Sequence, residues 1–331
     1  MKPSDILTTL PSLIELRRPV MLWGGPGVGK SSVVHQLAVK LKHEIRDVRL
    51  SQLSEIDIRG FPMPDQKTGT MRWLPADFLP TDDDPPGILF LDEMNAAPPS
   101  TAAAAYQLIL DFRIGSYVFP KHWTIIAAGN RQGDRGVVHT MPSPLSNRFI
   151  HLDFDLDLDD WLRHAASVGI HPHIRAYHQL KSDALYDFDP VKNPRAFPTP
   201  RTWEFLDQIY KTQLPLAQFW ELAKGTIGEG HAATFIGFVK DLADMPDMKE
   251  VWEKPKTAPL PKSPAVLHTV ITTLIDRMTF KDFDRCMEYI FRLGRDLQVV
   301  FVTNALHKDQ RITNSKSYIT WGMANVEIVA R

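Results

Sequence analysis

The sequence predicts an α/β protein in which helices cover both faces of a parallel sheet, followed by a mostly helical second half. Two observations lead to this prediction. In the first half, short apolar runs that do not alternate with polar residues are separated by segments of helical periodicity, as in strands buried on both faces. After about Asp157 the strand-like runs stop and helical patterns follow one another.

Five apolar runs are the expected strands, because most of their residues are β-branched or large and turn-forming segments flank them. They cover Pro19–Trp23, Asp47–Leu50, Ile88–Leu91, Trp123–Ala128 and Phe149–Leu152. Helical patterns between them cover Ser31–Lys42 and Ser100–Phe112. Parallel strands need such crossover helices, so the order of the segments supports a parallel sheet.

The second half is expected to be helical. Its predicted helices are Leu158–Val168, His173–Leu180, Pro200–Lys211, Pro215–Lys224, Ala232–Leu242, Pro264–Met278 and Phe280–Leu306. Between them, Trp252–Pro264 is rich in proline, lysine and glutamate and is predicted to be a linker or an extended surface arm.

The length and charge of the chain limit the classes of protein to which it can belong. A chain of 331 residues has room for about two domains, and its formal net charge of -1 gives no basic excess for nucleic acid. The single cysteine, Cys286, excludes an intramolecular disulfide and fits a reducing compartment. No signal sequence and no run of about 20 apolar residues is present, so we expect a cytoplasmic protein without a membrane partner.

The segment Gly24–Ser31, GGPGVGKS, matches the phosphate-binding loop pattern G-x-x-x-x-G-K-[ST] between an expected strand and an expected helix. Glycines let successive backbone N–H groups point at phosphate oxygens, and the helix N-terminus adds its positive end. Lys30 is expected to reach the β- and γ-phosphates and Ser31 to ligate Mg²⁺. The residues predicted to bind ATP are Gly25, Pro26, Gly27, Val28, Gly29, Lys30, Ser31 and Ser32.

Two further expected strands end in polar residues. Asp92 and Glu93 follow Ile88–Leu91, and ligands of open α/β sheets bind at such carboxyl ends. We expect Asp92 to hold Mg²⁺, largely through water, and Glu93 to polarise the attacking water. Asn130 follows Gly129 at the end of the next strand. Alone this pair is more typical of a turn, but beside the other two motifs it is interpreted as a sensor of the γ-phosphate.

Arginine stabilises the charge that develops during phosphoryl transfer. Arg148 precedes the last expected strand, and Arg201 lies in the first turn of an expected helix, where a cation is mildly unfavourable unless it meets an anion. Arg131 and Arg135 are weaker candidates.

These motifs together resemble the AAA+ ATPases, and their details resemble the MoxR branch over about residues 1–240. Asp92–Ala97, DEMNAA, is similar to the Asp-Glu-x-Asn-Arg-Ala element of that branch, with Ala96 in place of its arginine. Pro144–Phe149 resembles its Pro-Leu-x-x-Arg-Phe element, and Phe197–Trp203 resembles its second sensor. The resemblance implies an AAA+ nucleotide-binding domain over residues 1–156, a helical lid over 157–240 and a helical C-terminal extension over 241–331.

The resemblance also implies roles and partners. Arg148 would be an arginine finger that acts on ATP held by a neighbouring subunit, and Arg201 would be the second sensor. A finger in trans requires a homo-oligomeric ring, normally a hexamer. MoxR proteins typically act as chaperones with a von Willebrand factor A domain partner, and the client protein is not named by the sequence.

The same branch carries two added hairpins that usually face the pore or the client. Here Gly60–Trp73 and Arg113–Phe119 fit them. Phe61, Trp73, Tyr117 and Phe119 either touch a client or pack the hairpins, and the sequence does not separate these alternatives.

Two other function classes stay open: a nucleic-acid loader or motor, and a binding module that ATP switches with little turnover. Metal binding by His171, His173 and His178 is disfavoured because no cysteine or acidic ligand stands at suitable spacing. The aspartates of Asp153–Asp160 lack the glycine and distal glutamate of a calcium loop. They are interpreted as helix N-caps.

Overall fold

The computed structural model describes residues 1–67, 69–134, 139–192 and 194–329. The chain divides into two compact units. The first unit holds Met1–Asp160 with Asp189–Asn193, and the second holds Trp161–Phe188 with Pro194–Arg331.

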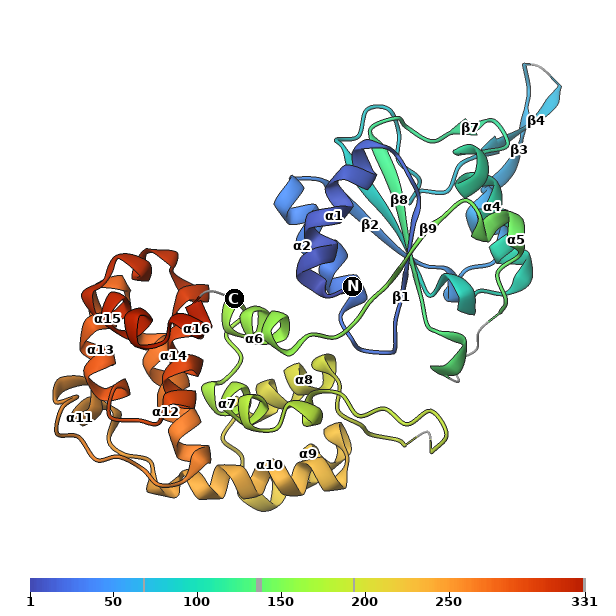
Figure 1. Ribbon diagram of the computed structural model, residues 1–331. Coiled ribbons are helices and arrows are strands. Elements are labelled where there is room, and N and C mark those ends of the chain that lie inside the picture. The colour runs from blue at the N-terminus through green and yellow to red at the C-terminus, as the bar shows by residue number, and fades with distance from the viewer. Residues whose placement is uncertain (68, 135–138, 193, 330–331) are drawn as a thin grey trace. The chain divides into compact units, whose positions relative to one another are not determined.

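The first unit is built on a five-stranded parallel sheet in the order β2-β5-β8-β1-β9 (Figure 1). The strands are β1 Val20–Trp23, β2 Glu44–Arg49, β5 Gly87–Asp92, β8 Trp123–Gly129 and β9 Ile150–Asp153. All five predicted strands form. β2 begins three residues before the predicted Asp47, because this edge strand is half exposed and polar Glu44 and Arg46 hide its start in the sequence.

Helices cover both faces of the sheet, as predicted (Figure 1). α1 Pro3–Glu15 and α2 Lys30–Leu41 lie on one face, and α3 Glu55–Arg59, α4 Pro99–Asp111 and α5 Ser143–Ser146 lie on the other. Successive residues of β5 alternate between the faces. Leu89 and Leu91 join the core under α4, whereas Ile88 and Phe90 are fully buried on the side of α2. Helix α1 was not predicted, because Pro11 interrupts its sequence pattern.

Both predicted hairpins form as antiparallel pairs. β3 Phe61–Asp65 pairs with β4 Thr70–Leu74, and β6 Arg113–Ile114 pairs with β7 Tyr117–Val118. The first hairpin is closed at its base, since a Cβ on Gly60 would lie 1.9 Å from the Leu74 carbonyl oxygen. Only glycine therefore fits there, at a φ of 85°.

The second unit is helical. It contains the end of α6 Leu158–Ser167, then α7 Pro172–Leu180, α8 Pro200–Lys211, α9 Leu216–Ile227, α10 Glu229–Asp241, α11 Met248–Glu253, α12 Pro264–Arg277, α13 Phe283–Ile290, α14 Arg295–Lys308, α15 Lys316–Ala324 and α16 Val326–Val329. No helix in the described ranges is long and apolar enough to cross a membrane.

One prediction for this unit was wrong, and a second was confirmed only in part, because the predicted surface segment is irregular and largely exposed but is packed at two points. The expected helix Phe280–Leu306 is broken into α13 and α14, and Gly294 is the N-cap of α14. The segment predicted as a linker or surface arm is fixed against α13: Tyr289 Oη donates to the Pro259 carbonyl oxygen (2.9 Å) and Arg292 Nη1 to that of Pro255 (2.8 Å). Ala258 is fully buried between these contacts. Its prolines shape a packed connection.

Candidate nucleotide-binding site

The phosphate-binding loop connects the end of β1 at Trp23 to the start of α2 at Lys30. Two of its glycines have positive φ values, 71° at Gly27 and 106° at Gly29. L-residues with a side chain rarely adopt such angles, so these glycines set the path of the loop. Gly29 is the N-cap of α2, which directs the positive end of the helix at the loop.

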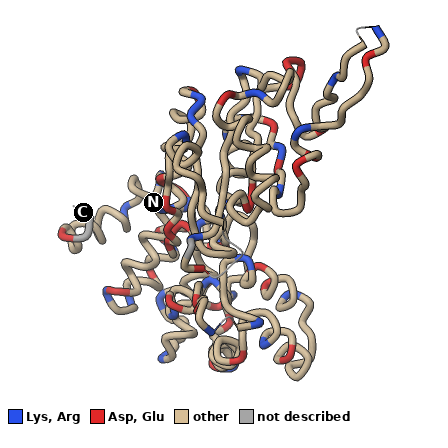
Figure 2. Tube along the Cα trace, turned by 90° about the vertical axis from the view of Figure 1, so that its right-hand side faces the viewer, with Lys and Arg blue, Asp and Glu red and all other residues tan. Residues whose placement is uncertain are grey.

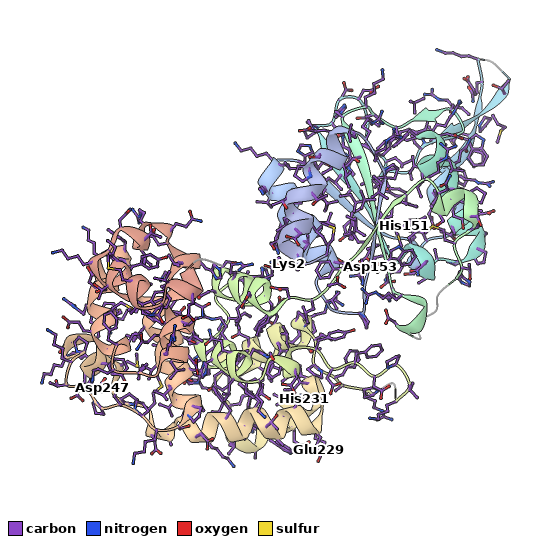
Figure 3. All side chains as sticks on the ribbon, viewed as in Figure 1. Lys2, His151, Asp153, Glu229, His231 and Asp247 are labelled. Atoms are coloured by element: carbon purple, nitrogen blue, oxygen red, sulfur yellow. The ribbon has the colours of Figure 1, made fainter. Side chains whose placement is uncertain are left out.

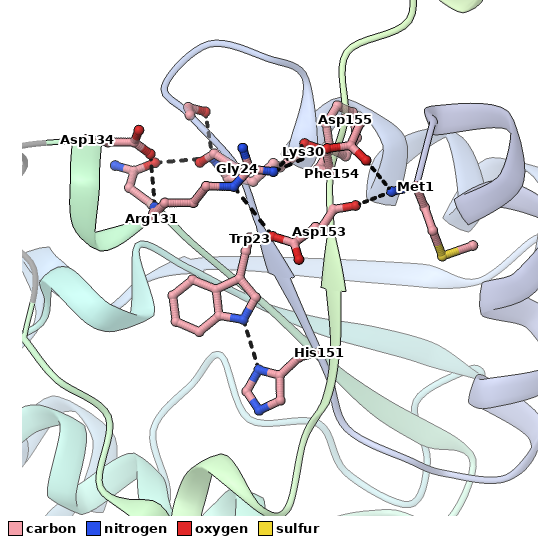
Figure 4. Close-up of polar contacts among 12 residues, drawn as sticks. Met1, Trp23, Gly24, Lys30, Arg131, Asp134, His151, Asp153, Phe154 and Asp155 are labelled. Carbon is pink, nitrogen blue, oxygen red and sulfur yellow. Dashed lines mark hydrogen bonds and ion pairs between the residues drawn. The ribbon is translucent and has the colours of Figure 1, made fainter. Parts of the chain in front are cut away.

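The Lys30 side chain lies inside this loop. Its Nζ donates to the carbonyl oxygens of Gly24 (2.7 Å) and Gly25 (2.9 Å) and to Asn130 Oδ1 (3.2 Å) (Figure 4). The residue is 8 % exposed. These three acceptors are neutral oxygens, and a nearly buried ammonium favours an anion beside it.

Ser31 and Asp92 come together across the sheet edge. Ser31 Oγ donates to Asp92 Oδ2 at 3.1 Å. A hydroxyl and a carboxylate are the hard oxygen ligands that Mg²⁺ prefers, and these two atoms are close enough to share one ion. The residues present therefore suit a magnesium ion beside the phosphates.

Glu93 has a left-handed backbone, with φ 53° and ψ 34°. Such a conformation costs a side-chain-bearing residue about 1 kcal/mol or more and is concentrated at functional sites. Ser51, in the turn Leu50–Gln52 after β2, donates its hydroxyl proton to Glu93 Oε2. No sequence pattern singled out Ser51, because its contact depends on the pairing of β2 with β5.

Asn130 is held by Asn95. Asn95 Nδ2 donates to the Asn130 carbonyl oxygen (2.7 Å), and the Asn130 N–H donates to Asn95 Oδ1 (3.2 Å). Gly129 allows this approach, because a Cβ there would lie 2.4 Å from Asn95 Oδ1 and 2.6 Å from Met21 Cε. Asn95 was part of the segment that carried the family resemblance, yet its positioning role emerges only in the structure.

Strand register explains why these groups converge. β1, β5 and β8 are parallel neighbours, so their carboxyl ends lie at one edge of the sheet. Asp92, Asn130 and the loop after Trp23 follow those ends. The same edge carries Arg131, which forms ion pairs with Asp153 (3.4 Å) and Asp155 (3.3 Å) of its own chain (Figure 4).

Arg148 lies at the opposite end of β9. It precedes Ile150, which pairs with Val20 at the start of β1. Strands rise about 3.3 Å per residue, so the length of β9 separates Arg148 from the edge with the phosphate loop. Its side chain is exposed and forms no hydrogen bond or ion pair with a residue that the structure describes. Arg135 lies outside the described residues.

Arg201 belongs to the second unit and is exposed. It follows Pro200 in the first turn of α8, where the side chain of Thr199 accepts a hydrogen bond from the Thr202 N–H (3.1 Å). Arg201 therefore lies in the first turn of a helix, as predicted.

The discounted metal candidates have other contacts. His171 Nδ1 accepts from the His173 N–H (3.1 Å), and His173 Nδ1 lies 2.7 Å from Tyr210 Oη. His178 is fully buried, with its ring edge-on to Trp203. Asp157 accepts from the Asp160 N–H at 2.9 Å, which confirms the predicted N-cap.

The first unit has the AAA+ P-loop fold, and its converged site is that of an ATP hydrolase. Within this class, residues 19–149 match a family model described as "AAA domain (dynein-related subfamily)". The chain therefore contains an AAA domain, and the match spans both the phosphate-binding loop and Arg148.

Comparison with solved structures gives distant similarities. A RuvB Holliday junction branch migration motor of Thermotoga maritima is 20 % identical, with a TM-score of 0.41 over 82 % of this chain and 80 % of that one. A point mutant of the same RuvB is 18 % identical, with a TM-score of 0.42 over 82 % of this chain and 80 % of that one. A putative ATPase of Cytophaga hutchinsonii is 13 % identical, with a TM-score of 0.39 over 90 % of this chain and 79 % of that one. Such low scores and identities transfer no function to this chain.

Proposed function

We propose that the chain is a MoxR-like chaperone ATPase that assembles into a homo-oligomeric ring, normally a hexamer, and remodels or activates a partner protein. The observation that carries this proposal is an exposed apolar hairpin on the unit that holds the nucleotide site. We define the client hairpin as β3 and β4 with their connecting turn.

The client hairpin presents apolar side chains to solvent. Phe61 is 62 % exposed and Trp73 is 42 % exposed, and Met63, Met71 and Leu74 are exposed as well. Phe61 pairs with Leu74 and the neighbouring Pro62 with Trp73, so both faces of the hairpin carry apolar groups. In Figure 1 the hairpin projects from the sheet of its own unit. Exposed apolar patches of this kind favour protein contacts.

The second hairpin has a different role. Phe119 is 1 % exposed and packs near Phe112, with ring centroids 6.1 Å apart. Tyr117 Oη donates to the Pro80 carbonyl oxygen at 2.6 Å, and burial raises the pKa of this phenol. Of the four aromatic residues considered from the sequence, we therefore assign client contact to Phe61 and Trp73 and packing to Tyr117 and Phe119.

The residues at the sheet edge divide the hydrolysis of ATP among them. Lys30 and the loop N–H groups bind the phosphates, and Ser31 and Asp92 would hold Mg²⁺, which when bound neutralises charge on the phosphate oxygens. Glu93 orients water and withdraws its proton as the water attacks the γ-phosphorus, while Asn130 holds the water and the γ-phosphate in line. Cleavage of the bond to the γ-phosphorus leaves ADP and phosphate.

Two arginines would act from elsewhere. Arg148 would stabilise the transferring phosphoryl group on a neighbouring subunit, a role that its exposure and its distance from its own phosphate loop support. Arg131 is less suited, because its charge is paired with two aspartates beside its own site. Arg201 would contact the γ-phosphate from the lid, and its exposed place in the first turn of α8 leaves it available.

A protein client fits the charge distribution better than nucleic acid. The formal net charge is -1, and Lys and Arg are interspersed with Asp and Glu along the trace (Figure 2). The expected partner is a protein with a von Willebrand factor A domain. A loader or motor on nucleic acid is the competing outcome.

Co-purification from the native host tests the proposal, with a Glu93→Gln bait in Mg-ATP or Mg-ADP. A second bait adds Phe61→Ser and Trp73→Ser, and a control adds Ile319→Ser, which alters an exposed apolar residue of α15. We expect a von Willebrand factor A protein with ATP only, lost with the hairpin changes and kept with the control. Salt-sensitive retention of DNA would replace the proposal with a motor. Full biological function of Glu93→Gln would replace it with a nucleotide switch.

A further inference from the structure

A chain of side-chain contacts runs from the phosphate loop to the segment that carries Arg148. Trp23 Nε1 donates to His151 Nδ1 at 2.8 Å (Figure 4). His151 Nε2 lies 2.8 Å from the Ser146 carbonyl oxygen and 3.2 Å from Ser146 Oγ. The Trp23 and His151 rings are also stacked, 5.9 Å apart at 17°.

Hydrogen-bond chemistry fixes the direction of this chain. The indole N–H of Trp23 is only a donor, so His151 Nδ1 must be an unprotonated acceptor. In the neutral imidazole Nε2 then carries the proton, which it donates to the Ser146 carbonyl oxygen. One tautomer of His151 satisfies the hydrogen bonds of Trp23, His151 and Ser146. Because the imidazole ring is rigid, a displacement of Trp23 would be transmitted through it to Ser146.

The two ends of the chain have different functions. Trp23 is the last residue of β1 and directly precedes Gly24 of the phosphate loop. Ser146 is the last residue of α5 and stands two residues before Arg148. His151, labelled in Figure 3, is on β9 beside Met21. Because Met21 and Trp23 are two residues apart on β1, the His151 side chain leaves the sheet on the same face as Trp23.

The backbone already joins β1 to β9 without these side chains. The Phe154 N–H donates to the Trp23 carbonyl oxygen (2.7 Å), and four residues of each strand are in register. His151 is exposed and Trp23 is half-buried. The sheet therefore does not need the side-chain contacts to form, which leaves them available for another task.

We propose that Trp23 and His151 position Arg148 according to the state of the phosphate loop in the same subunit. Occupation of one site then changes how Arg148 serves the neighbouring site, which couples the sites of a ring. Trp23 and His151 are positioning residues and touch no reacting atom. This inference rests on the proposed role of Arg148 as a finger in trans.

Trp23→Phe tests the relay, since it removes the N–H donor and keeps an aromatic ring. His151→Leu removes both ring nitrogens, and Trp252→Phe in the second unit is the matched control. We expect the two relay variants to lower kcat about fivefold and to bring the Hill coefficient for ATP close to one, with Kd for ATP changed less than twofold. The control should keep the wild-type values. Unchanged cooperativity in both relay variants would overturn the inference, as would a weakened Kd alone.

A double-mutant cycle separates this inference from the proposed function. If the relay acts through Arg148, Trp23→Phe added to Arg148→Ala causes no further loss of kcat. Additive losses would overturn the relay and leave the finger intact. Independently, Arg148→Ala subunits mixed into wild-type protein should poison its ATPase. Absence of poisoning would overturn the trans role of Arg148, whatever the cycle shows.

Discussion

The two units place their polar groups differently. In the nucleotide-binding unit the polar side chains gather at one sheet edge, where Asp92, Glu93 and Asn130 stay partly accessible. In the helical unit several polar groups lie inside the core, among them Arg175, Asp207 and His178. Groups at the edge are placed to meet a ligand, whereas groups in the core hold helices together. Substitutions should therefore cost activity in the first unit and stability in the second.

The largest expected effect is on activity. Glu93→Gln removes the proposed base for the attacking water, and kcat should fall at least about 100-fold. The free energy of unfolding should change by less than about 1 kcal/mol, because the amide preserves the shape of the side chain. Steady-state ATPase assays and thermal melts check both. A variant that melts far lower would contradict the division between the units.

The largest effect on stability should come from Arg175. Its guanidinium is 6 % exposed, pairs with Asp276 and donates from Nε to the Ile170 carbonyl oxygen (3.0 Å). Arg175→Met leaves Asp276 without this partner and should destabilise the second unit by about 2 kcal/mol, at the low end for a broken pair because Asp276 is partly exposed. Urea unfolding measures this, with exposed Arg285→Met as the control. ATP affinity of the first unit should be unchanged.

Gly129→Ala should lower both activity and stability. The new Cβ would lie 2.4 Å from Asn95 Oδ1, so Asn95 must move and release Asn130. We expect about 1 to 3 kcal/mol of destabilisation from overpacking, together with a loss of kcat. Gly133→Ala is the control, since no atom lies within 4 Å of its added Cβ. Wild-type kcat in Gly129→Ala would contradict the positioning role of Asn95.

Acid should weaken the helical unit. Burial lowers the pKa of His178 to about 3 and that of His173 to about 4, from 6.5 in each case. Below pH 6.5 these histidines bind protons in the unfolded chain but stay neutral in the folded unit. The free energy of unfolding therefore falls as pH decreases from 6.5 towards these pKa values, by about 1.4 kcal/mol per pH unit for each proton. His178→Phe should flatten this dependence in unfolding experiments between pH 7 and 5. An unchanged slope would count against burial as the cause.

The smallest expected effect concerns Ser51. Its hydroxyl holds the Glu93 carboxylate, so Ser51→Ala should free that group and raise basal ATPase about two- to fivefold, with little change in stability. Ser54→Ala, which removes a hydrogen bond to Asp57 in the neighbouring turn, is the control. A fall in activity would show that Ser51 holds Glu93 in its working position.

Sequence patterns predicted those features of the fold and the site that depend on residues close together in the chain. The phosphate loop and the five strands follow from glycine positions and apolar runs, and the sheet edge follows from strand direction. Asn95 and Ser51 were out of reach, because their contacts join residues on different strands and turns. Arg131 was a weaker candidate than Arg148 from the sequence, and its ion pairs with Asp153 and Asp155 became visible only in the structure.

The helical unit was harder to predict for a related reason. Apolar periodicity continues through Phe280–Leu306, and it outweighed Gly294, the residue that caps α14 after the break. The prolines of the preceding segment, Trp252–Pro264, indicated a linker or an extended surface arm. Their carbonyl oxygens are nevertheless fixed by Tyr289 and Arg292, which no local pattern encodes.

The tight base of the client hairpin has a consequence for how this protein can change. Gly60 and Leu74 are in contact at the base of the hairpin. The two ends of the hairpin are therefore held together independently of the residues between them. Its sequence can be lengthened, shortened or exchanged while the ends stay where they are and the nucleotide-binding machinery is undisturbed. On the proposed function, client choice could be changed by replacing the segment between Phe61 and Leu74, without altering the residues that bind the nucleotide.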